Sequence, residues 1–518
     1  MKYMIVFPEI VYDDCRTFLL RDPHNEQFGY LLAGVNEETD QYVKLLVHTF
    51  LPAESREDLE YQSTGGICPS PKFQMRVYSM CKREGYHLID VHSHPFDNSA
   101  YVRFSGIDDR YEFGSGREGV FGFTAMWNPG MYHASIVFGQ NSLDARIYRA
   151  DMGRAVPIDE VRVFSRIIPT GARLRQRQTI AEVTTPQVAS STTAETEQPT
   201  EEKKTGNDDV FGDGSSGGSS DALNTLYSRQ ILAFGKAGQE ELANTTVAVI
   251  GAGGLGSIVV EILARLGIRE IICVDDDVIE ASNLSRVLGS TAQDVENHTA
   301  KVHALGRHVK TINPEIIYTP VMDTILNPQA QAFLKRADFI ISGTDTHSSR
   351  LVLNQFAVQY LIPYIDLGFG METDEQRQWL VSAGGKVITF IPGSWCFHCL
   401  GEIDQRELQL ELMRKEDRER QIARGYISGV DIPNPSVIFL NMTVAALGIC
   451  EFLNLLAPFK ERNLYIFYDM LATRLWSMKA KPKLECPVCS REAERLGRGD
   501  LLALEDLRDA EARSLPEN

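Results

Sequence analysis

An apolar strand, a glycine-rich turn and a helix follow one another in TTVAVIGAGGLGSIVVEILARLG, residues 245–267. Glycine at Gly251, Gly253, Gly254 and Gly256 lets the chain turn tightly and lets backbone N–H groups approach a phosphate at the helix N-terminus. Asp275 lies about twenty positions further on, where an acidic side chain can hold ribose hydroxyl groups. The stretch predicts a Rossmann-like nucleotide-binding domain. Taken alone, it leaves an NAD-dependent dehydrogenase open.

The rest of the chain predicts an α/β protein with two different sheets. In the C-terminal half, apolar strands alternate with helices, which is typical of a doubly wound, largely parallel sheet. In the N-terminal part, short alternating runs indicate strands, and residues 71–85 indicate a helix between two of them. We therefore expect a mixed α/β domain followed by a Rossmann-like domain.

A polar segment over residues 186–222 separates these two parts. It contains almost no large apolar side chains, so it cannot bury enough surface to offset its conformational entropy. We expect a flexible linker that leaves the geometry of the flanking domains unfixed. The expected order is a first domain (1–150), a connecting arm that packs on it (151–185), the linker (186–222), a second domain (223–492) and a charged helical tail (493–518).

Composition excludes several functions. A net charge of −18 over 518 residues argues against nucleic-acid binding. We expect a cytoplasmic protein without a membrane partner, since no apolar run approaches the length of a membrane helix and no signal peptide is evident. In that reducing compartment, the pairs CFHC (396–399) and CPVC (486–489) point to a metal ion. Buried thiols are expected at the other five cysteines, Cys15, Cys68, Cys81, Cys273 and Cys450.

A histidine cluster in HSHPFDNSAYVRFSGIDD predicts a catalytic metal site in the first domain. His92 and His94 lie at the end of a predicted strand, where positions i and i+2 share a face. Asp108 can add an oxygen ligand, leaving a position for water on a zinc ion. Glu26 is a candidate general base, and Ser105 can donate a hydrogen bond to an oxyanion.

The order Glu, HxHP and SxxD resembles the JAMM metalloproteases, also called JAB/MPN domains, over most of residues 1–140. The resemblance implies cleavage of isopeptide or peptide bonds after the C-terminal tail of ubiquitin-like proteins. It also implies that zinc is bound by His92, His94 and Asp108. Glu26 would then be the general base, and Ser105 would stabilise the intermediate. One departure is the spacing: thirteen residues separate His94 from Asp108, about three more than usual. We expect a longer loop at the rim of the cleft.

The residues after the second strand distinguish an adenylating enzyme from a dehydrogenase. Asn283, Arg286, Lys301 and Asp345 follow in order. Cations can neutralise a triphosphate as pyrophosphate leaves, and a carboxylate can hold Mg²⁺. A hydride-transfer enzyme has no use for such a cluster.

The ordered series YSRQI, GxGGLG, DxD, NxxR, Lys, TD and two CxxC pairs over about residues 226–490 resembles the ThiF/MoeB/ubiquitin-activating superfamily. The resemblance implies that the glycine loop and Asp275 bind ATP, that Asn283, Arg286 and Lys301 contact its phosphates, and that Asp345 handles Mg²⁺ and the attacking carboxylate. Arg229 would reach the ATP of a partner subunit, which implies a homodimer.

Two further expectations concern side chains near these motifs. Strand alternation predicts that Asp277 points toward the nucleotide and Asp276 away from it. The four paired cysteines leave no open position on a zinc ion, so this zinc should be structural. It would be held by Cys396, Cys399, Cys486 and Cys489.

The crossover loop after the first CxxC contains no cysteine, although many relatives carry a nucleophilic cysteine there. Either the adenylate passes directly to an outside acceptor or another residue replaces the thiol. Ser428 lies close to the expected position and is a weak candidate, because a serine in a turn is usually only a turn residue.

Together the two halves predict a bifunctional enzyme of a bacterial ubiquitin-like pathway. A ubiquitin-like protein ending in Gly-Gly would be processed or released by the zinc protease and adenylated with ATP. Fused proteins of this kind are often linked to phage defence, which the resemblance implies here too. The product would pass to a conjugating enzyme. The alternatives are activation of a sulfur-carrier protein for cofactor or cysteine biosynthesis and a non-catalytic scaffold that binds ubiquitin-like proteins.

Overall fold

The computed structural model of the chain describes residues 1–38, 41–114, 119–163, 166–168, 226–374, 379–413, 420, 435–479, 481–483, 485–490 and 493–507. The expected linker (186–222) and most of the expected arm (151–185) lie outside the described residues. So do Ser428 and the end of the expected tail.

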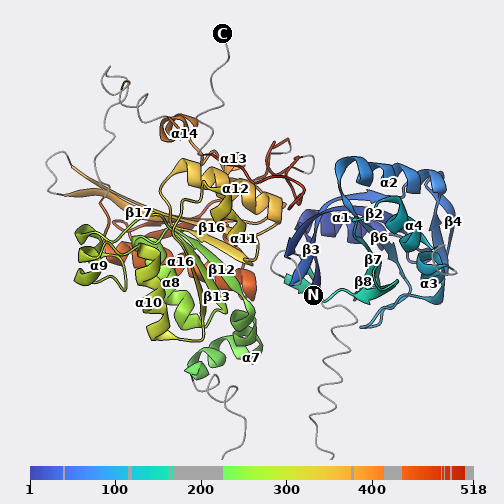
Figure 1. The fold of residues 1–518 in the computed structure, drawn as a ribbon, viewed down its shortest axis with the longest axis horizontal. Helices are drawn as coiled ribbons and strands as arrows, with labels where there is room; N and C mark the ends of the chain where they lie inside the picture. The colour runs from blue at the N-terminus through green and yellow to red at the C-terminus, as the bar shows by residue number, and fades with distance from the viewer. Residues whose placement is uncertain are drawn as a thin grey trace, which may run out of the picture.

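The N-terminal domain is built on a nine-stranded sheet in the order β11-β10-β1-β3-β2-β6-β7-β8-β9 (Figure 1). Its strands are β1 (Lys2–Phe7), β2 (Phe28–Glu38), β3 (Tyr42–Pro52), β6 (His87–Ser93), β7 (His133–Phe138), β8 (Leu143–Arg149), β9 (Arg154–Pro157), β10 (Glu160–Val163) and β11 (Arg166–Ile168). A separate hairpin is formed by β4 (Leu59–Ser63) and β5 (Gly66–Pro69). The helices are α1 (Glu9–Leu19), α2 (Pro71–Glu84), α3 (Gly106–Phe113) and α4 (Val120–Trp127). Three strands of this sheet lie beyond residue 150, so the sheet extends past the expected domain boundary.

Local signals explain why α2 forms where it does. Ser70 accepts a hydrogen bond from Phe73 N, Pro71 occupies the first turn, and Gly85 ends the helix in the left-handed region with φ of 78°. The buried face of the helix carries Phe73 and Val77, which join the core cluster on one side of the sheet. The helix therefore covers the strands that lead to the histidine cluster.

The C-terminal domain contains an eight-stranded sheet in the order β14-β13-β12-β15-β16-β17-β18-β19, whose first five strands are parallel. The strands are β12 (Thr246–Ile250), β13 (Glu270–Val274), β14 (Ile317–Val321), β15 (Phe339–Ser342), β16 (Tyr364–Thr373), β17 (Leu380–Phe390), β18 (Tyr465–Asp469) and β19 (Arg474–Ser477). The helices are α7 (Ser228–Asn244), α8 (Gly254–Leu266), α9 (Ala292–Glu296), α10 (Lys301–Ile312), α11 (Pro328–Leu334), α12 (His347–Tyr360), α13 (Phe397–Leu400), α14 (Gln405–Glu411) and α16 (Ile438–Leu456), with a 3₁₀ turn η1 (Ala281–Ser285). The expected doubly wound sheet is present.

Helix α16 corrects the expectation that no apolar run approaches membrane length. By length and composition this helix could span a membrane, but over half of its apolar stretch is buried inside the protein. It packs on α8 and on β16 and β17. Its apolar character is therefore that of a core helix. Cys450 on this helix is only half-buried, as is Cys68 on β5, so these two cysteines are not the buried thiols expected.

The two domains pack against each other, and the segment after the second CxxC lies between them (Figure 1). Gly34 N on β2 donates to Gly497 O (3.1 Å), and Asp500 N donates to Val35 O (2.6 Å). A direct ion pair joins Arg162 to Asp338 at 2.6 Å. Within the described residues, the two domains therefore contact each other directly, while the flexibility of the linker stays a prediction.

The expected charged helical tail also needs correction. Residues 493–507 form turns and bends rather than a helix. Gly497 and Gly499 adopt φ of 64° and 51°, which a right-handed helix does not allow. Arg498 between them donates hydrogen bonds to Tyr86 OH and Glu84 O of the N-terminal domain. The segment therefore serves as a contact between the domains.

Candidate functional site

The first candidate site lies where strand β6 ends. His92 belongs to β6 and His94 follows it directly, so their side chains leave the sheet on one face. Asp108 lies in the first turn of α3. Glu26 comes just before β2, where Phe28 pairs with His92. Glu26 and both histidines are buried, and Asp108 is half-buried. The structure thus brings the predicted cluster together.

The atoms of this cluster are spaced for a shared metal ion. His92 Nε2 lies 3.2 Å from Asp108 Oδ1, and His94 Nε2 lies 3.5 Å from Asp108 Oδ2. Two ligand atoms on a tetrahedral zinc ion lie roughly 3.4 Å apart, given bond lengths of about 2.0–2.2 Å. His92 Nε2 is buried, and Asp108 Oδ1 is the polar atom that faces it. The donors therefore fit a zinc ion, and Glu26 Oε1 lies 3.8 Å from His94 Nε2.

Burial and charge shift the two carboxyl groups in opposite directions. Burial raises the pKa of Glu26, and the nearby His92 and His94 offset only part of that effect. Burial also disfavours ionised Asp108, but the hydrogen bond and charge of His92 outweigh it and hold the pKa of Asp108 well below its usual value. Asp108 is thus suited to bind a cation, and Glu26 to accept a proton.

Ser105 also has a structural role at the start of α3. Its Oγ accepts hydrogen bonds from Ile107 N and Asp108 N, and the Asp108 carboxylate accepts one from Ser105 N. This capping box begins α3 and orients Asp108 toward the histidines. Because Oγ only accepts in these bonds, its proton remains available for an oxyanion.

The four paired cysteines form a second metal-binding cluster. Their sulfur atoms all lie within 4.8 Å of one another. Cys396 Sγ lies 3.8 Å from Cys486 Sγ, and Cys399 Sγ lies 3.6 Å from Cys489 Sγ. Tetrahedral zinc with bonds of about 2.3 Å would place sulfur atoms roughly 3.8 Å apart. The cluster therefore fits a four-thiolate zinc site that joins α13 to the second CxxC, shortly before the segment between the domains.

The glycine loop between β12 and α8 is packed so closely that side chains do not fit at most positions. Gly251 has φ of 90°, and a Cβ at Gly256 would lie 1.7 Å from the Gly251 carbonyl oxygen. A Cβ at Gly254 would lie 2.3 Å from Asn441 Nδ2, whereas one at Gly253 would meet nothing within 4 Å. The loop leads into the N-terminus of α8, where backbone N–H groups stabilise an anion.

Acidic and basic side chains gather beside this loop. Asp275 accepts hydrogen bonds from Ala252 N (2.7 Å) and Asp277 N (2.9 Å), so it also holds the loop in place. Lys301 Nζ pairs with Asp277 Oδ2 at 2.6 Å, at the first residue of α10. Asp276 and Asp277 are both exposed, so burial does not separate them. Asp277 differs in its ion pair with Lys301, and its orientation toward a nucleotide stays a prediction.

Three other predicted residues lie around the same loop. Arg286 has its Cδ 3.4 Å from where a Gly254 Cβ would be. Asn283 is buried, and its Oδ1 accepts a hydrogen bond from Glu280 N, so its amide shapes η1. Asp345 is exposed and lies shortly after β15. Gly343, directly after that strand, donates its N–H to Ile250 O at the base of the loop. Asn283 thus supports the site, and Arg286 and Asp345 flank it.

Arg229 is the one predicted residue that the structure does not bring to this site. It lies exposed in the first turn of α7. The neighbouring Gln230 donates to Arg265 O, at the C-terminal end of α8. The thirteen residues of α8 span about 20 Å, so Arg229 lies far from the glycine loop of its own chain.

Asn441 is a site residue that sequence reasoning missed. It lies on α16, fully buried, with its amide against Gly254 and its Oδ1 without a hydrogen-bond partner among the described residues. Its Nδ2 donates to Ser436 Oγ at 3.3 Å. The sequence does carry a sign of this role, because Asn441 is an amide within the apolar run IFLNMTVAALGICEFLNLL. A polar side chain in such a run is buried and needs a hydrogen-bond partner.

Comparison with known proteins agrees with both sets of motifs. The sequence model described as ThiF family matches residues 227–488, and the one described as prokaryotic homologs of the JAB domain matches residues 8–150. The sulfur carrier protein ThiS adenylyltransferase of Bacillus subtilis is 32% identical over 34% of this chain and 49% of its own length. The SAMP-activating enzyme E1 of Haloferax volcanii is 26% identical over 54% of this chain and 92% of its own length.

Among solved structures, E. coli MccB with ATP is 24% identical, with 52% of this chain and 75% of MccB covered and a TM-score of 0.40. The match to the Bacillus subtilis enzyme covers about half of that enzyme's length. The ThiF match alone takes in more than half of the present sequence. The chain belongs to the ThiF family and carries a domain of the prokaryotic JAB type ahead of its ThiF domain.

Proposed function

We propose that the C-terminal domain adenylates the C-terminal carboxylate of a ubiquitin-like or sulfur-carrier protein. The observation that carries this proposal is the glycine loop at the N-terminus of α8 with Lys301, Arg286 and Asp345 around it. The names of two relatives, a ThiS adenylyltransferase and a SAMP-activating enzyme, support the substrate class.

In this reaction the substrate carboxylate attacks the α-phosphorus of ATP and pyrophosphate leaves. Backbone N–H groups of the loop bind phosphate oxygens, while Arg286 and Lys301 neutralise charge that develops on the leaving group. Asp345 would hold Mg²⁺, which supplies further positive charge when bound. Asp275 accepts a hydrogen bond from the loop, and its carboxylate can also accept hydrogen bonds from the ribose hydroxyl groups of ATP.

ATP–pyrophosphate exchange tests this proposal. We expect exchange that depends on a ubiquitin-like protein ending in Gly-Gly and that falls at least about a hundredfold in Asp345→Ala. Glu240→Ala, an exposed acidic position on α7, should keep full exchange. Binding of NAD without ATP–pyrophosphate exchange would contradict adenylation and favour the hypothesis of an NAD-dependent dehydrogenase.

We propose that the N-terminal domain is a zinc-dependent peptidase or isopeptidase that processes or deconjugates the same ubiquitin-like protein. The convergence of His92, His94 and Asp108 with Glu26 beside them supports this function. When bound, zinc would supply Lewis acidity that polarises the scissile carbonyl and acidifies water. Glu26 would take a proton from the attacking water and return it to the leaving amine, while the Ser105 hydroxyl donates to the oxyanion.

Metal analysis and a cleavage assay test the peptidase together. We expect two zinc ions per purified chain, one lost in His92→Ala and the other in Cys486→Ser. Glu26→Gln should keep both ions and lose cleavage of a ubiquitin-like protein fused through its Gly-Gly end. His24→Ala, an exposed histidine, is the matched control. Full zinc content in His92→Ala would contradict the site.

We also propose a homodimer in which Arg229 acts on the ATP of the partner subunit. The distance of Arg229 from the glycine loop of its own chain supports a role at the partner's site. Exposed apolar side chains in the same region support an interface there: Leu226, Leu232 and Phe234. Arg229→Ala and Asp345→Ala should each lack exchange, and a mixture should regain part of it because one hybrid site is complete. No recovery in a mixture shown to contain hybrid dimers would contradict action across the interface.

We infer that conjugation, through a separate conjugating enzyme, is the outlet of the adenylate. A fused peptidase that releases conjugates has a direct use in a conjugation pathway, and this favours conjugation over sulfur transfer. A thiocarboxylate on the carrier, detected by mass spectrometry after reaction with a sulfurtransferase, would favour the sulfur-carrier alternative instead.

A further inference from the structure

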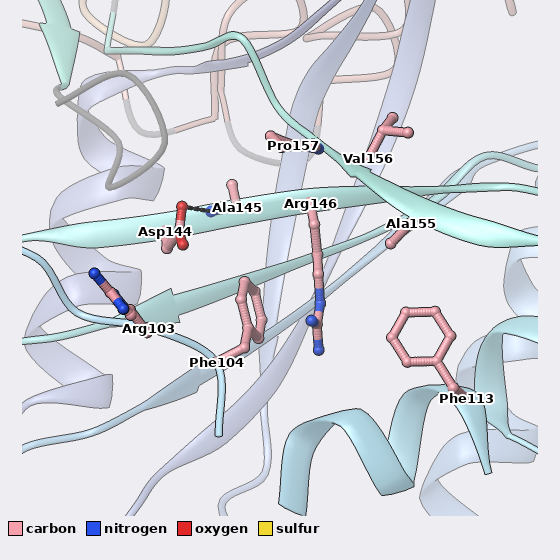
Figure 2. Close-up of a pocket in the computed structure, with 9 residues that line it drawn as sticks. All are labelled: Arg103, Phe104, Phe113, Asp144, Ala145, Arg146, Ala155, Val156 and Pro157. Carbon is pink, nitrogen blue, oxygen red and sulfur yellow. Dashed lines mark hydrogen bonds between the residues drawn. The ribbon is translucent and has the colours of Figure 1, made fainter. Parts of the chain in front are cut away.

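A cavity of about 390 Å³ lies beside the histidine cluster (Figure 2). It is lined by Arg103, Phe104, Phe113, Asp144, Ala145, Arg146, Ala155, Val156 and Pro157. Figure 2 shows the guanidinium of Arg146 between the rings of Phe104 and Phe113, with Arg103 and Asp144 at the other end of the cavity. Its walls are apolar and its polar groups are charged.

Strand register fixes the position of this cavity relative to the metal cluster. His92 pairs with Val137 on β7, and Val137 pairs with Asp144 on β8. Directly paired residues share a face of the sheet, so Asp144 lies on the face of His92, two strands away. Two strand spacings are about 10 Å, which an extended peptide covers in about three residues. A peptide cleaved at the metal can therefore reach the cavity with a side chain.

One aromatic ring forms the wall between the cavity and the cluster. The Phe104 ring lies 6.0 Å from the His92 ring, and Arg146 Cζ lies 3.8 Å above Phe104. The unusually long segment between His94 and Ser105 carries Phe104. Gln140 Nε2 donates to Pro95 O (2.7 Å), and Val102 N donates to Ser142 Oγ (2.9 Å). These bonds hold the segment on the turn between β7 and β8, so the longer loop builds one side of the cavity.

The charges of the lining residues are not all compensated. Arg146 forms ion pairs with Asp109 (2.8 Å) and Glu112 (2.6 Å). Asp144 also has a partner. Arg103 is exposed, and no ion pair or hydrogen bond joins its side chain to the described part of the chain. The cavity therefore offers an entering ligand the exposed guanidinium group of Arg103 above apolar walls, with the Asp144 carboxylate at the same end of the cavity.

We propose that this cavity is a specificity pocket that takes an acidic side chain located about three residues from the scissile bond. The proposal rests on the proposed peptidase function of the cluster. The apolar walls pack against the methylene groups of a glutamate, and Arg103 pairs with its carboxylate at the rim. Charge recognition of this kind, partly exposed to solvent, changes affinity by a small factor.

Short internally quenched peptides with a central Gly-Gly test the pocket on the full-length, zinc-loaded chain. Glu, Gln, Lys or Leu is placed in turn three residues before and three residues after the cleavage point. At one of the two positions we expect Glu to exceed Gln by about fivefold in kcat/KM. Arg103→Ala should abolish that preference, and Arg103→Glu should reverse it in favour of Lys. Arg110→Ala, an exposed arginine of α3 outside the cavity lining, should leave it unchanged.

Zinc content and binding of the same peptides, followed by fluorescence anisotropy, separate the outcomes. Cleavage without any preference for Glu, or with a preference that survives Arg103→Ala, overturns the pocket and leaves the peptidase intact. Binding of the Glu peptide that depends on Arg103, without cleavage of any substrate, supports the pocket and overturns the peptidase. Loss of zinc in Arg103→Ala shows that the residue supports the metal site instead, which also overturns the pocket.

Discussion

His87 is a buried histidine that links the protonation of one side chain to the stability of the N-terminal domain. Its Nδ1 accepts a hydrogen bond from Tyr132 N at 2.9 Å, and its Nε2 is buried without a partner among the described residues. Burial lowers the pKa of His87 from 6.5 to about 4. The folded state therefore binds this proton less readily than the unfolded state does.

Stability should depend on pH through this residue. Below pH 6.5 the unfolded chain takes up a proton at His87, while the folded chain stays neutral until about pH 4. The contribution of His87 to the free energy of unfolding is fully present above pH 6.5 and is lost as the pH falls from 6.5 to about 4. The expected loss between pH 7 and pH 5 is about 2 kcal/mol. Urea denaturation of the full chain at both pH values measures it.

A glutamine provides the control because it can accept the Tyr132 hydrogen bond but does not titrate. His87→Gln should lose less stability than the wild type between pH 7 and pH 5, although it starts from a lower value. Other histidines titrate equally in both proteins. An identical pH dependence in the two proteins would show that His87 does not carry the effect.

Individual site residues differ in how well the sequence predicts them. His92, His94 and Asp108 follow from ligand chemistry and spacing, because only a few side chains bind zinc. The capping role of Ser105 depends on where α3 begins, and Asn441 meets the glycine loop only through the packing of α16. Contacts between distant segments leave little trace in a single sequence.

The glycine loop between β12 and α8 shows how one element tolerates substitution unequally. We expect Gly256→Ala to lower the free energy of unfolding by about 1–3 kcal/mol, because its Cβ would overlap the Gly251 carbonyl. Gly253→Ala meets open space and should retain wild-type stability. Thermal denaturation without nucleotide measures both. Equal melting temperatures would contradict the packing of this loop.

The same pair of variants separates stability from nucleotide binding. If phosphate approaches the loop as proposed, the methyl group of Gly253→Ala occupies space next to it, so ATP should bind more weakly to a stably folded protein. Isothermal titration with ATP measures this. Unchanged affinity would place the phosphates elsewhere.

Helices and strands with a strong hydrophobic pattern are predicted well from the sequence. Strands that form only because a neighbouring strand offers hydrogen bonds are not. The apolar strands β12, β13 and β15 and helix α8 follow from hydrophobic runs around the glycine loop. The short strands β9–β11 have little periodicity, and they form because the sheet edge offers hydrogen bonds. In the segment 493–507, Gly497 and Gly499 at positive φ outweigh the charged pattern that suggested a helix.

At the scale of the whole molecule, the described parts of the two domains contact each other through the segment 493–507 and through the Arg162–Asp338 ion pair. In Figure 1, helix α3, which carries Asp108, and helix α8, which begins at the glycine loop, lie in separate domains. If both proposed functions hold, the substrate tail has to pass from one domain to the other between the two reactions.

Gly34 is the position where this contact can be broken with the least other damage. A Cβ there would lie 2.2 Å from Gly497 O and 2.4 Å from Arg498 C, so Gly34→Ala should push the segment 493–507 away. Within β2 itself an alanine is tolerated. We expect a larger radius of gyration in solution scattering and faster proteolysis between the domains, with zinc content unchanged.

Gly65→Ala is the matched control, because its Cβ would meet nothing within 4 Å in the same domain. Arg498→Ala should act in the same direction as Gly34→Ala, since it removes hydrogen bonds to Tyr86 and Glu84 without adding bulk. If the contact holds the two sites apart, both variants should process and adenylate a shared substrate with altered relative rates. Scattering profiles identical to the wild type in both variants would mean that this segment does not hold the domains together in solution.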